Sequence, residues 1–283
     1  MRHPVRTVAL ALGIALVATG ADEIDSKREK ILYPAVRVKS SYAQGSGTVV
    51  YSEARGGEQR TFVLTNHHVV ASAIKVVEEW DNLKQRKVQK EKNDLVDVEI
   101  FNWVDGVISD QRTVKAAVYA HDREGDLALL ELKSSERPYP EKLAYVAKIA
   151  GPGRLRVFTP IVAVGCGMGL DPTHSSGEVT DPEEIIEGKT YTQGSAPIIF
   201  GNSGGAVYAL QGDGGDWRLV GIPARIVVQG GAGVNHLNFF IPPPRIHEFV
   251  RAQKVDFLTD SGKTPADADK AREEAREPKE GKP

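Results

Sequence analysis

Three short segments of the sequence place a histidine, an aspartate and a serine in settings that suit nucleophilic catalysis. They are TNHHVV at 65–70, with His68; GDLALL at 125–130, with Asp126; and GNSGGAV at 201–207, with Ser203. A serine hydroxyl becomes an effective nucleophile when a base takes its proton. A neutral imidazole with a pKa of about 7 can take that proton and return it to a leaving amine. A carboxylate that orients the imidazole completes a set of groups able to hydrolyse a peptide bond.

Glycines surround the candidate nucleophile, at Gly201, Gly204 and Gly205. Because glycine adopts backbone conformations that other residues avoid, such a turn can bring several amide N–H groups to one point. Converging N–H groups stabilise the oxyanion that forms when a serine attacks a carbonyl. The three segments follow the order histidine, aspartate, serine, which is the order found in chymotrypsin-type barrels.

Short strands must carry these segments. From residue 31 to 158 the chain is mostly short, alternating runs rich in β-branched residues and separated by turn formers, and a second such block runs from 160 to 242. The densely charged stretch 78–94 interrupts the first block, and we expect a solvated loop or a hairpin insertion there. Ile246, Phe249 and Val250 then follow the i, i+3, i+4 spacing of an amphipathic helix. The pattern predicts two antiparallel barrels or sandwiches with a closing helix.

In this order, the three segments resemble the trypsin-like serine protease superfamily, and most closely its bacterial HtrA (Deg) branch. That branch carries its histidine in T-N-x-H-V-V, its aspartate in D-L-A-L-L and its serine in G-N-S-G-G-A. The stretches 45–50, 162–165, 176–179, 221–222 and 240–242 are similar as well, so the resemblance spans residues 33 to 250. It implies an all-β fold of two antiparallel Greek-key six-stranded β-barrels (chymotrypsin-like) with a C-terminal helix. It further implies a protease domain over 30–255, with one barrel over about 30–138 and the other over about 139–255.

The resemblance also implies a role for each candidate residue. His68 is expected to be the general base, Asp126 the carboxylate that orients it, and Ser203 the nucleophile of a serine endopeptidase. The backbone amides of Gly201 and Ser203 are expected to form the oxyanion hole. The expected substrates are unfolded or damaged proteins of the cell envelope.

Two neighbouring residues compete for these roles. His67 is a rival base, but the family motif puts the base immediately before the two valines that follow His68. Asp122 is a rival carboxylate, but no apolar strand follows it directly as one follows Asp126. The motif therefore favours His68 and Asp126.

The substrate pocket is expected to be formed by Pro197, Ile198, Ala224, Arg225, Ile226 and Phe240. Neither Pro197 nor Ile198, at the expected base of the pocket, is acidic, so we do not expect cleavage after Lys or Arg, and we predict a preference for small or medium apolar residues. Ala224 lacks the hydroxyl that the family pattern G-I-N-T-A places near the catalytic aspartate. Arg225 could instead attract acidic side chains. A glutamyl-type endopeptidase and a catalytically silent, peptide-binding pseudoprotease are therefore the alternatives.

Composition excludes several other classes of protein. The 283 residues are 41% hydrophobic and 26% charged, as in globular chains, and the net charge of −2 is too balanced for a nucleic-acid coat protein or a polybasic membrane binder. Cys166 is the single cysteine, so no intramolecular disulfide can form, and its apolar surroundings predict a small buried side chain. The remaining histidines lack metal-ligand spacing. We expect polypeptide substrates as partners, no nucleic acid, no metal and no cofactor.

The two ends of the chain carry separate signals. The segment 1–21 has the basic start, short apolar run and small-residue exit of a secretory signal peptide. Its apolar run is shorter than the ~20 residues that span a bilayer, so we expect cleavage and no stable membrane anchor afterwards. Export without disulfides fits a bacterial periplasmic or secreted protein. The charged segment 256–283 is predicted to be a disordered tail, too short for the PDZ domain usual in the HtrA branch. Proteins of that branch typically form trimers; whether this chain forms a trimer or another homo-oligomer is not determined by its sequence.

Overall fold

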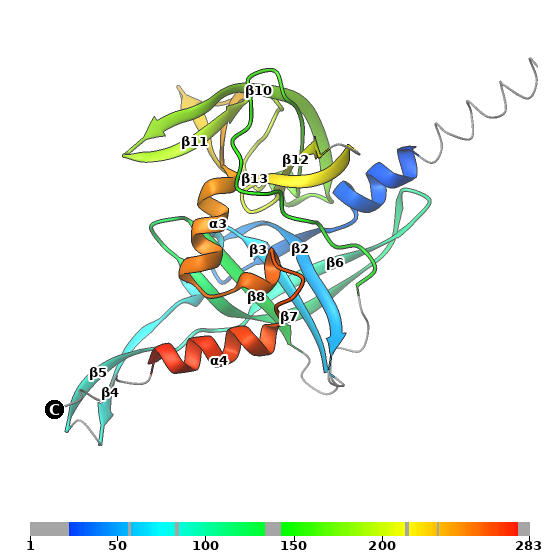
Figure 1. The fold of residues 1–283 in the computed structure, drawn as a ribbon. Coiled ribbons are helices and arrows are strands. Elements are labelled where there is room, and N and C mark those ends of the chain that lie inside the picture. Colours follow the sequence, from blue (N-terminus) through cyan, green and yellow to red (C-terminus); the bar gives the residue numbers. More distant parts are fainter. Residues whose placement is uncertain are drawn as a thin grey trace, which may run out of the picture.

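The computed structural model describes residues 23–55, 58–82, 85–133, 143–212, 215–230 and 232–276. Within these residues, twelve strands close into two six-stranded antiparallel barrels (Figure 1). The first barrel contains β1 (Ala35–Lys39), β2 (Gln44–Arg55), β3 (Glu58–Thr65), β6 (Val96–Val104), β7 (Val107–Asp122) and β8 (Leu127–Lys133). The second contains β9 (Pro160–Gly165), β10 (Thr173–Ile186), β11 (Lys189–Gly194), β12 (Ala206–Gln211), β13 (Asp216–Gln229) and β14 (Ala232–Ile241). The predicted all-β, two-barrel fold is confirmed.

Both barrels share one strand order. The first closes as β1-β2-β3-β8-β7-β6 and the second as β9-β10-β11-β14-β13-β12. Counted within each barrel, the order is 1-2-3-6-5-4, so the fourth strand returns to lie beside the first, as in a Greek key. The predicted boundary between the barrels, near residue 138, lies outside the described residues.

Strands β3 and β8 are neighbours that are buried on both faces. Val63 and Leu130 lie opposite each other and pack inside the first barrel. Leu64 and Leu129, the next pair along the ladder, join a cluster shared with the second barrel and the C-terminal elements. Successive side chains of a strand point to opposite faces, so both faces of this strand pair contribute to a core. The ends of β3 and β8, where two of the three motifs lie, are therefore held from two sides.

Short helices and one hairpin complete the fold. The helices are η1 (Arg28–Leu32), α2 (His67–Val70), η2 (Ala71–Ala73), η3 (Gly167–Gly169), α3 (Pro243–Ala252), η4 (Asp256–Leu258) and α4 (Pro265–Arg276). Helix α3 buries Ile246, Phe249 and Val250, which confirms the closing helix. Strands β4 (Val76–Asp81) and β5 (Arg86–Glu91) form a separate two-stranded sheet, so the charged stretch is a hairpin insertion. In the described part of the chain, we find no helix with the length and apolar character needed to span a membrane.

The predicted disordered tail is wrong for residues 256–276. Phe257 and Leu258 of η4 are buried in the core cluster that the two barrels share. Thr264 and Asp267 then cap α4 reciprocally, since the backbone N–H of each donates to the other's side chain, at 2.8 and 3.2 Å. The composition argument failed because it considered whether the tail could build a core of its own, whereas the tail packs on a core that already exists. Residues 277–283 and the predicted signal peptide lie outside the described residues.

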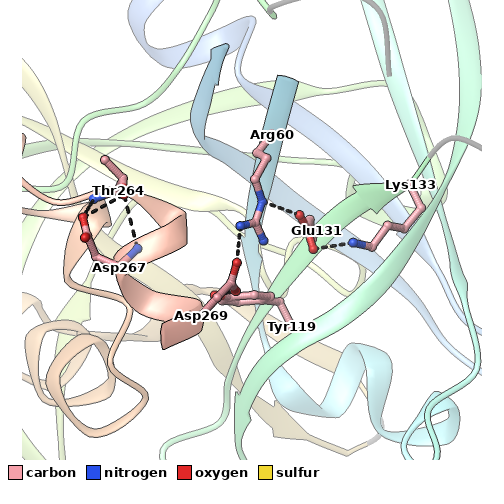
Figure 2. Close-up of polar contacts among 7 residues, drawn as sticks. All are labelled: Arg60, Tyr119, Glu131, Lys133, Thr264, Asp267 and Asp269. Atoms are coloured by element: carbon pink, nitrogen blue, oxygen red, sulfur yellow. Dashed lines mark hydrogen bonds and ion pairs between the residues drawn. The ribbon is translucent and has the colours of Figure 1, made fainter. Parts of the chain in front are cut away.

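Charged side chains attach α4 to the first barrel (Figure 2). Asp269 accepts hydrogen bonds from Arg60 Nη1 at 2.6 Å and from the Tyr119 hydroxyl at 2.7 Å. Arg60 Nε also donates to Glu131 at 2.7 Å, and Lys133 donates to the same carboxylate. The network joins α4 to β3, β7 and β8, so the C-terminal segment is part of the folded unit.

Candidate active site

The end of β3 and the start of β8 bring His68 and Asp126 together. Thr65, the last residue of β3, pairs with Ala128, so the residues just beyond the two strand ends are neighbours. The His68 ring Nδ1 lies 2.9 Å from Asp126 Oδ2, and the His68 backbone N–H donates to Asp126 Oδ1 at 3.0 Å. Asn66 Nδ2 donates to the Asp126 carbonyl at 2.8 Å. The carboxylate therefore holds both the backbone and the ring of His68.

The two rival residues lie differently. His67 is 9% exposed, and its ring packs 5.4 Å from the ring of His121, measured between centroids. Burial, together with the neighbouring His121, holds the pKa of His67 below its ordinary value. The Asp122 carboxylate lies against the backbone of Gly125, in the turn that precedes β8. Within the described residues, neither rival shares the contact that joins His68 to Asp126.

Ser203 lies in a tight turn after β11 and directly before β12, and the Gly204 N–H ties this turn to the Pro223 carbonyl of β13. Gly201 and Gly204 have φ of +96° and +81°, in the left-handed region that favours glycine. A Cβ on Gly204 would also collide with Thr65 Oγ1 and the Ser46 carbonyl. Ser203 and His68 line the same cavity, which has a volume of about 530 Å³. In the part of the chain that the structure describes, no hydrogen bond joins their side chains.

Ser46 on β2 holds this turn from the first barrel. Its backbone N–H donates to the Ser203 carbonyl at 2.8 Å, and its hydroxyl donates to the Gly201 carbonyl at 2.6 Å. The same hydroxyl accepts the Cys166 N–H at 2.7 Å, and the Ser46 carbonyl accepts the Thr65 hydroxyl at 2.7 Å. Ser46 is fully buried. Sequence reasoning missed this role. The one signal for it in the sequence is that Ser46 stands between Gly45 and Gly47, in the glycine-rich strand β2 upstream of the histidine motif.

Two backbone N–H groups beside the nucleophile are free. The Phe200 carbonyl accepts the Met168 N–H at 2.7 Å, and the Asn202 N–H donates to the Ile199 carbonyl at 3.1 Å. Among the described residues, neither Gly201 nor Ser203 donates its backbone N–H to any group. These two N–H groups are available to a ligand bound at the nucleophile.

The cavity agrees in part with the predicted pocket. Of the predicted residues, Ile198, Ala224, Arg225 and Ile226 line it, while Pro197 and Phe240 do not. Pro197 is exposed, and Phe240 is fully buried in the core of the second barrel, where its ring fills the space that side chains at Gly194 and Gly221 would need. Sequence reasoning missed Ile199, Phe200, Pro223 and Val228 as lining residues.

Half of strand β13 presents a free edge to this cavity. Residues 216–221 pair with β12 on one side, whereas residues 222–229 pair with β14 on the other. In the described residues, the second half of β13 has no strand on its remaining edge. Ala224, Arg225, Ile226 and Val228 from this half all line the cavity.

We find no candidate metal centre in the described part of the chain, since no three His, Cys, Asp or Glu side chains gather there in a suitable group. Cys166 is buried and has no disulfide partner. Burial raises the pKa of its thiol to about 12, so the thiol stays protonated near neutral pH.

Comparison with known proteins adds evidence independent of this geometry. The family described as trypsin-like peptidase domain matches residues 45–222. The periplasmic pH-dependent serine endoprotease DegQ of Escherichia coli (strain K12) is 30% identical over 217 residues, which are 75% of this chain and 37% of that protein. The periplasmic serine endoprotease DegP of Salmonella typhimurium is 30% identical over 219 residues, or 76% of this chain and 36% of that protein. The chain thus spans little more than a third of the length of these relatives.

A solved structure shows the same fold. The HtrA-type protease AlgW with tripeptide superposes with a TM-score of 0.56 at 19% sequence identity, covering 85% of this chain and 64% of that one. At this level of identity, the likeness concerns the fold.

Proposed function

The chain belongs to the trypsin-like peptidase family, in its HtrA/Deg branch, and from this we propose that it is a serine endopeptidase acting through His68, Asp126 and Ser203. One observation carries the proposal: the His68–Asp126 pair and Ser203 meet at a single cavity beside two free backbone N–H groups. A nucleophile, an oriented base and preorganised donors are the groups that acyl transfer requires.

The proposed reaction follows from these positions. Ser203 Oγ attacks the carbonyl carbon of the substrate while His68 Nε2 takes the hydroxyl proton, and Nδ1–H donates to Asp126. The N–H groups of Gly201 and Ser203 donate to the oxyanion, and losing one such donor costs roughly 3–4 kcal/mol of transition-state stabilisation. His68 then gives its proton to the leaving amine, which departs as the C–N bond breaks. Water, deprotonated by His68, hydrolyses the acyl-enzyme and regenerates Ser203.

The free edge of β13 supports binding of an extended polypeptide. A peptide can add to such an edge as a further strand, with its backbone supplying the hydrogen bonds. Pro223 has no N–H to offer, and its carbonyl already accepts the Gly204 N–H at 3.2 Å, so pairing would begin at Ala224. The lining residues Ile198 and Ile226 support a small or medium apolar residue at the cleaved position. Extended, accessible chains of this kind are a property of unfolded or damaged proteins.

Ala224 leaves Asp126 without the hydroxyl partner that the family pattern supplies. The carboxylate keeps two partners from His68, since Oδ1 accepts the backbone N–H and Oδ2 lies 2.9 Å from the ring Nδ1. Asn66 Nδ2 holds the backbone of Asp126 by donating to its carbonyl. These contacts are compatible with a working carboxylate. A glutamyl-type specificity is the second candidate, favoured by the guanidinium of Arg225 at the cavity.

We further propose that the protein is exported and works in the cell envelope, with 1–21 as the signal peptide and with the protease domain of 30–255 extended by η4 and α4. The named relatives are periplasmic, which supports this location. Fractionation of cells carrying the full chain should recover a shortened protein outside the cytoplasm. Full-length protein retained in the cytoplasm would contradict it.

A fluorophosphonate probe tests the activity directly, because it reacts with an activated serine. We expect the wild-type protein to be labelled, Ser203→Ala to lose labelling, and the exposed control Ser109→Ala to keep it. Cleavage of an unfolded protein should follow the same pattern. If the wild-type protein binds unfolded polypeptides but is neither labelled nor active, it is instead the silent, peptide-binding protein.

A further inference from the structure

Arg225 is the one charged side chain among the described residues that line the cavity with His68 and Ser203. It lies on the half of β13 that has a free edge. Its guanidinium Nη2 donates to Glu187 Oε2 at 2.7 Å, and its Cζ lies 5.4 Å from the centroid of the Tyr191 ring. Arg225 therefore reaches the cavity and, at the same time, binds the carboxylate of Glu187.

Glu187 belongs to the turn between β10 and β11. Ile186 pairs with Lys189, so Glu187 and Gly188 form a two-residue turn, with φ of +52° and +75°. Such turns favour Asn-Gly or Asp-Gly, because both central residues need positive φ. The turn itself therefore does not call for a glutamate. What the glutamate adds is its reach to Arg225.

The ion pair between Glu187 and Arg225 is open to solvent. The side chain of Glu187 is 69% exposed and that of Arg225 is 37% exposed. Exposed ion pairs contribute little to stability. The hydrogen bond from Arg225 lowers the pKa of Glu187, so both partners are charged near neutral pH. A second carboxylate brought to Arg225 can therefore take the place of Glu187 with little loss.

We propose that Arg225 forms an auxiliary subsite for an acidic side chain of the substrate, and that Glu187 occupies this subsite until substrate binds. The proposal rests on the proposed endopeptidase function and deepens it by adding to the substrate class. A peptide paired with β13 brings its side chains to the lining residues in turn. The Arg225 guanidinium lies at Glu187 and the Tyr191 ring, whereas Ile198 and Ile226 line the cavity with Ser203. The substrate residue that meets the guanidinium therefore differs from the one that meets these apolar side chains. A peptide added antiparallel to β13, as the strands of this barrel pair, runs toward Ser203, because the turn of Ser203 contacts β13 at Pro223. The acidic residue then lies on the N-terminal side of the cleaved bond and is not the cleaved residue itself.

The expected preference for Glu over Gln in the substrate depends on whether the substrate carboxylate must displace Glu187 from Arg225. In the wild-type protein, Glu187 competes with the substrate, and we expect Glu to be preferred over Gln by about threefold, as is typical of an exposed charge pair. In Glu187→Gln, Arg225 is free of competition, and the preference should rise to about tenfold, as for a hydrogen bond between charged groups. In Arg225→Gln, it should vanish. The preference should also fall as salt is added.

The test uses peptides that share one apolar residue at the cleaved position and carry either Glu or Gln at each of the preceding positions in turn. The ratio of kcat/KM for each Glu/Gln pair is measured in the full chain and its variants. Two matched controls change the same charges elsewhere. Arg218→Gln alters another arginine of β13, which pairs with Asp216, and Glu124→Gln alters an exposed glutamate that pairs with Lys189. Both controls should keep the wild-type ratio.

Three outcomes would overturn the proposal: a ratio that persists in Arg225→Gln, no preference at any position in Glu187→Gln, or an acidic preference confined to the cleaved residue. The third would favour the glutamyl-type enzyme. Failure of the proposed function looks different, since no peptide would then be cut in a Ser203-dependent manner. For that case, the affinities of the same Glu and Gln peptides are measured by fluorescence anisotropy in the Ser203→Ala background. Equal affinities with and without Arg225 would also reject the subsite.

Discussion

Strand β3 carries a polar network at each of its ends, and the two networks differ in how completely they are satisfied. Near its start, Arg60 donates to Glu131 and Asp269, and Phe62 and Tyr119 lie beside its guanidinium, with centroids 5.2 and 5.6 Å from Cζ. Beyond its other end, His68 binds Asp126 but keeps a side chain that is 47% exposed. We call the network around Arg60 the closed end, because protein carboxylates and aromatic rings surround the guanidinium. We call the network around His68 the open end, because its imidazole remains accessible to a ligand.

This difference separates groups that stabilise the fold from groups that are available for chemistry. Burial acts to lower the pKa of Arg60, but the hydrogen bonds that Arg60 donates to Glu131 and Asp269 outweigh it and raise the pKa above its ordinary value. A charge held by two carboxylates in this way contributes to the stability of the fold. By contrast, the N–H groups of Gly201 and Ser203 have no hydrogen-bond acceptor among the described residues, so they can donate to a ligand. Substitutions at the two ends should therefore affect different properties, and four predictions test this comparison.

The largest effect is expected at the open end. Asp126→Asn keeps an oxygen that can accept the His68 backbone N–H, but its amide favours the wrong tautomer of the ring. We expect kcat to fall by about 10⁴-fold, with little change in the free energy of unfolding. Steady-state kinetics and chemical denaturation measure the two quantities. Asp122→Asn is the matched control and should be nearly as active as the wild-type protein; the reverse result would make Asp122 the orienting carboxylate.

At the closed end, Arg60→Met should affect stability and spare chemistry. The substitution leaves the largely buried Glu131 and the half-exposed Asp269 without their shared cation, and breaking a buried pair such as Arg60–Glu131 costs about 3 kcal/mol. We expect that loss in the free energy of unfolding, measured by urea denaturation. The kcat of the folded protein should stay near normal.

Arg154→Met serves as the control, because Arg154 is 71% exposed and pairs with Glu183. It should change the free energy of unfolding by less than about 1 kcal/mol. A loss of kcat in Arg60→Met without a loss of stability would contradict the assignment of the Arg60 network to stability and of the His68 network to chemistry.

Ser46→Ala tests the link between the first barrel and the nucleophile turn. The substitution leaves the Gly201 carbonyl and the Cys166 N–H without their shared partner, and an unsatisfied buried group costs about 1–3 kcal/mol. If that cost falls on the oxyanion site, kcat drops by tenfold or more while KM changes little. A peptide boronic acid, which resembles the transition state, should lose affinity in parallel.

Ser52→Ala makes the same substitution on the same strand, at a buried hydroxyl that binds Thr61 and the Leu143 N–H. It should lower the free energy of unfolding but leave kcat unchanged. Equal effects of the two variants on kcat would show that Ser46 acts on stability alone.

The smallest effect concerns pH. The pKa of His67 lies below its ordinary value of 6.5, through burial and the neighbouring His121; Asp126 opposes this shift, and Arg123 and His68 add smaller lowering effects. The unfolded chain therefore binds a proton at this residue more readily than the folded chain. The free energy of unfolding should fall as the pH drops below about 6.5. Denaturation midpoints between pH 7.5 and 5 measure the slope.

His67→Gln should flatten this part of the stability profile, and the exposed His174→Gln should not. The window lies above the range in which Asp and Glu titrate, so paired carboxylates such as Asp269 contribute at lower pH. An unchanged slope in His67→Gln would assign the effect to another group.

Much of the fold could be predicted from the sequence, because the information is local. Alternation along the strands and the amphipathic spacing of Ile246, Phe249 and Val250 depend on neighbouring residues, and they predicted the strands and the closing helix. The contents of the cavity depend on which residues meet in space. Phe240 was predicted to line the pocket, yet its ring lies in the core beside Gly221, because the local strand pattern does not say which face of β14 turns inward.

The sequence by itself determined the types of residue available for chemistry and their order along the chain, since spacing and glycine content are written in it. It also determined that no disulfide holds the chain, because Cys166 stands alone. The motif favoured His68 and Asp126, and the tertiary structure added the contact between them. Only the tertiary structure decided that Ser46 holds the turn of Ser203 and that Arg60 binds α4. Each of these contacts joins residues far apart in the chain, and their distance in space depends on how the two barrels close and pack.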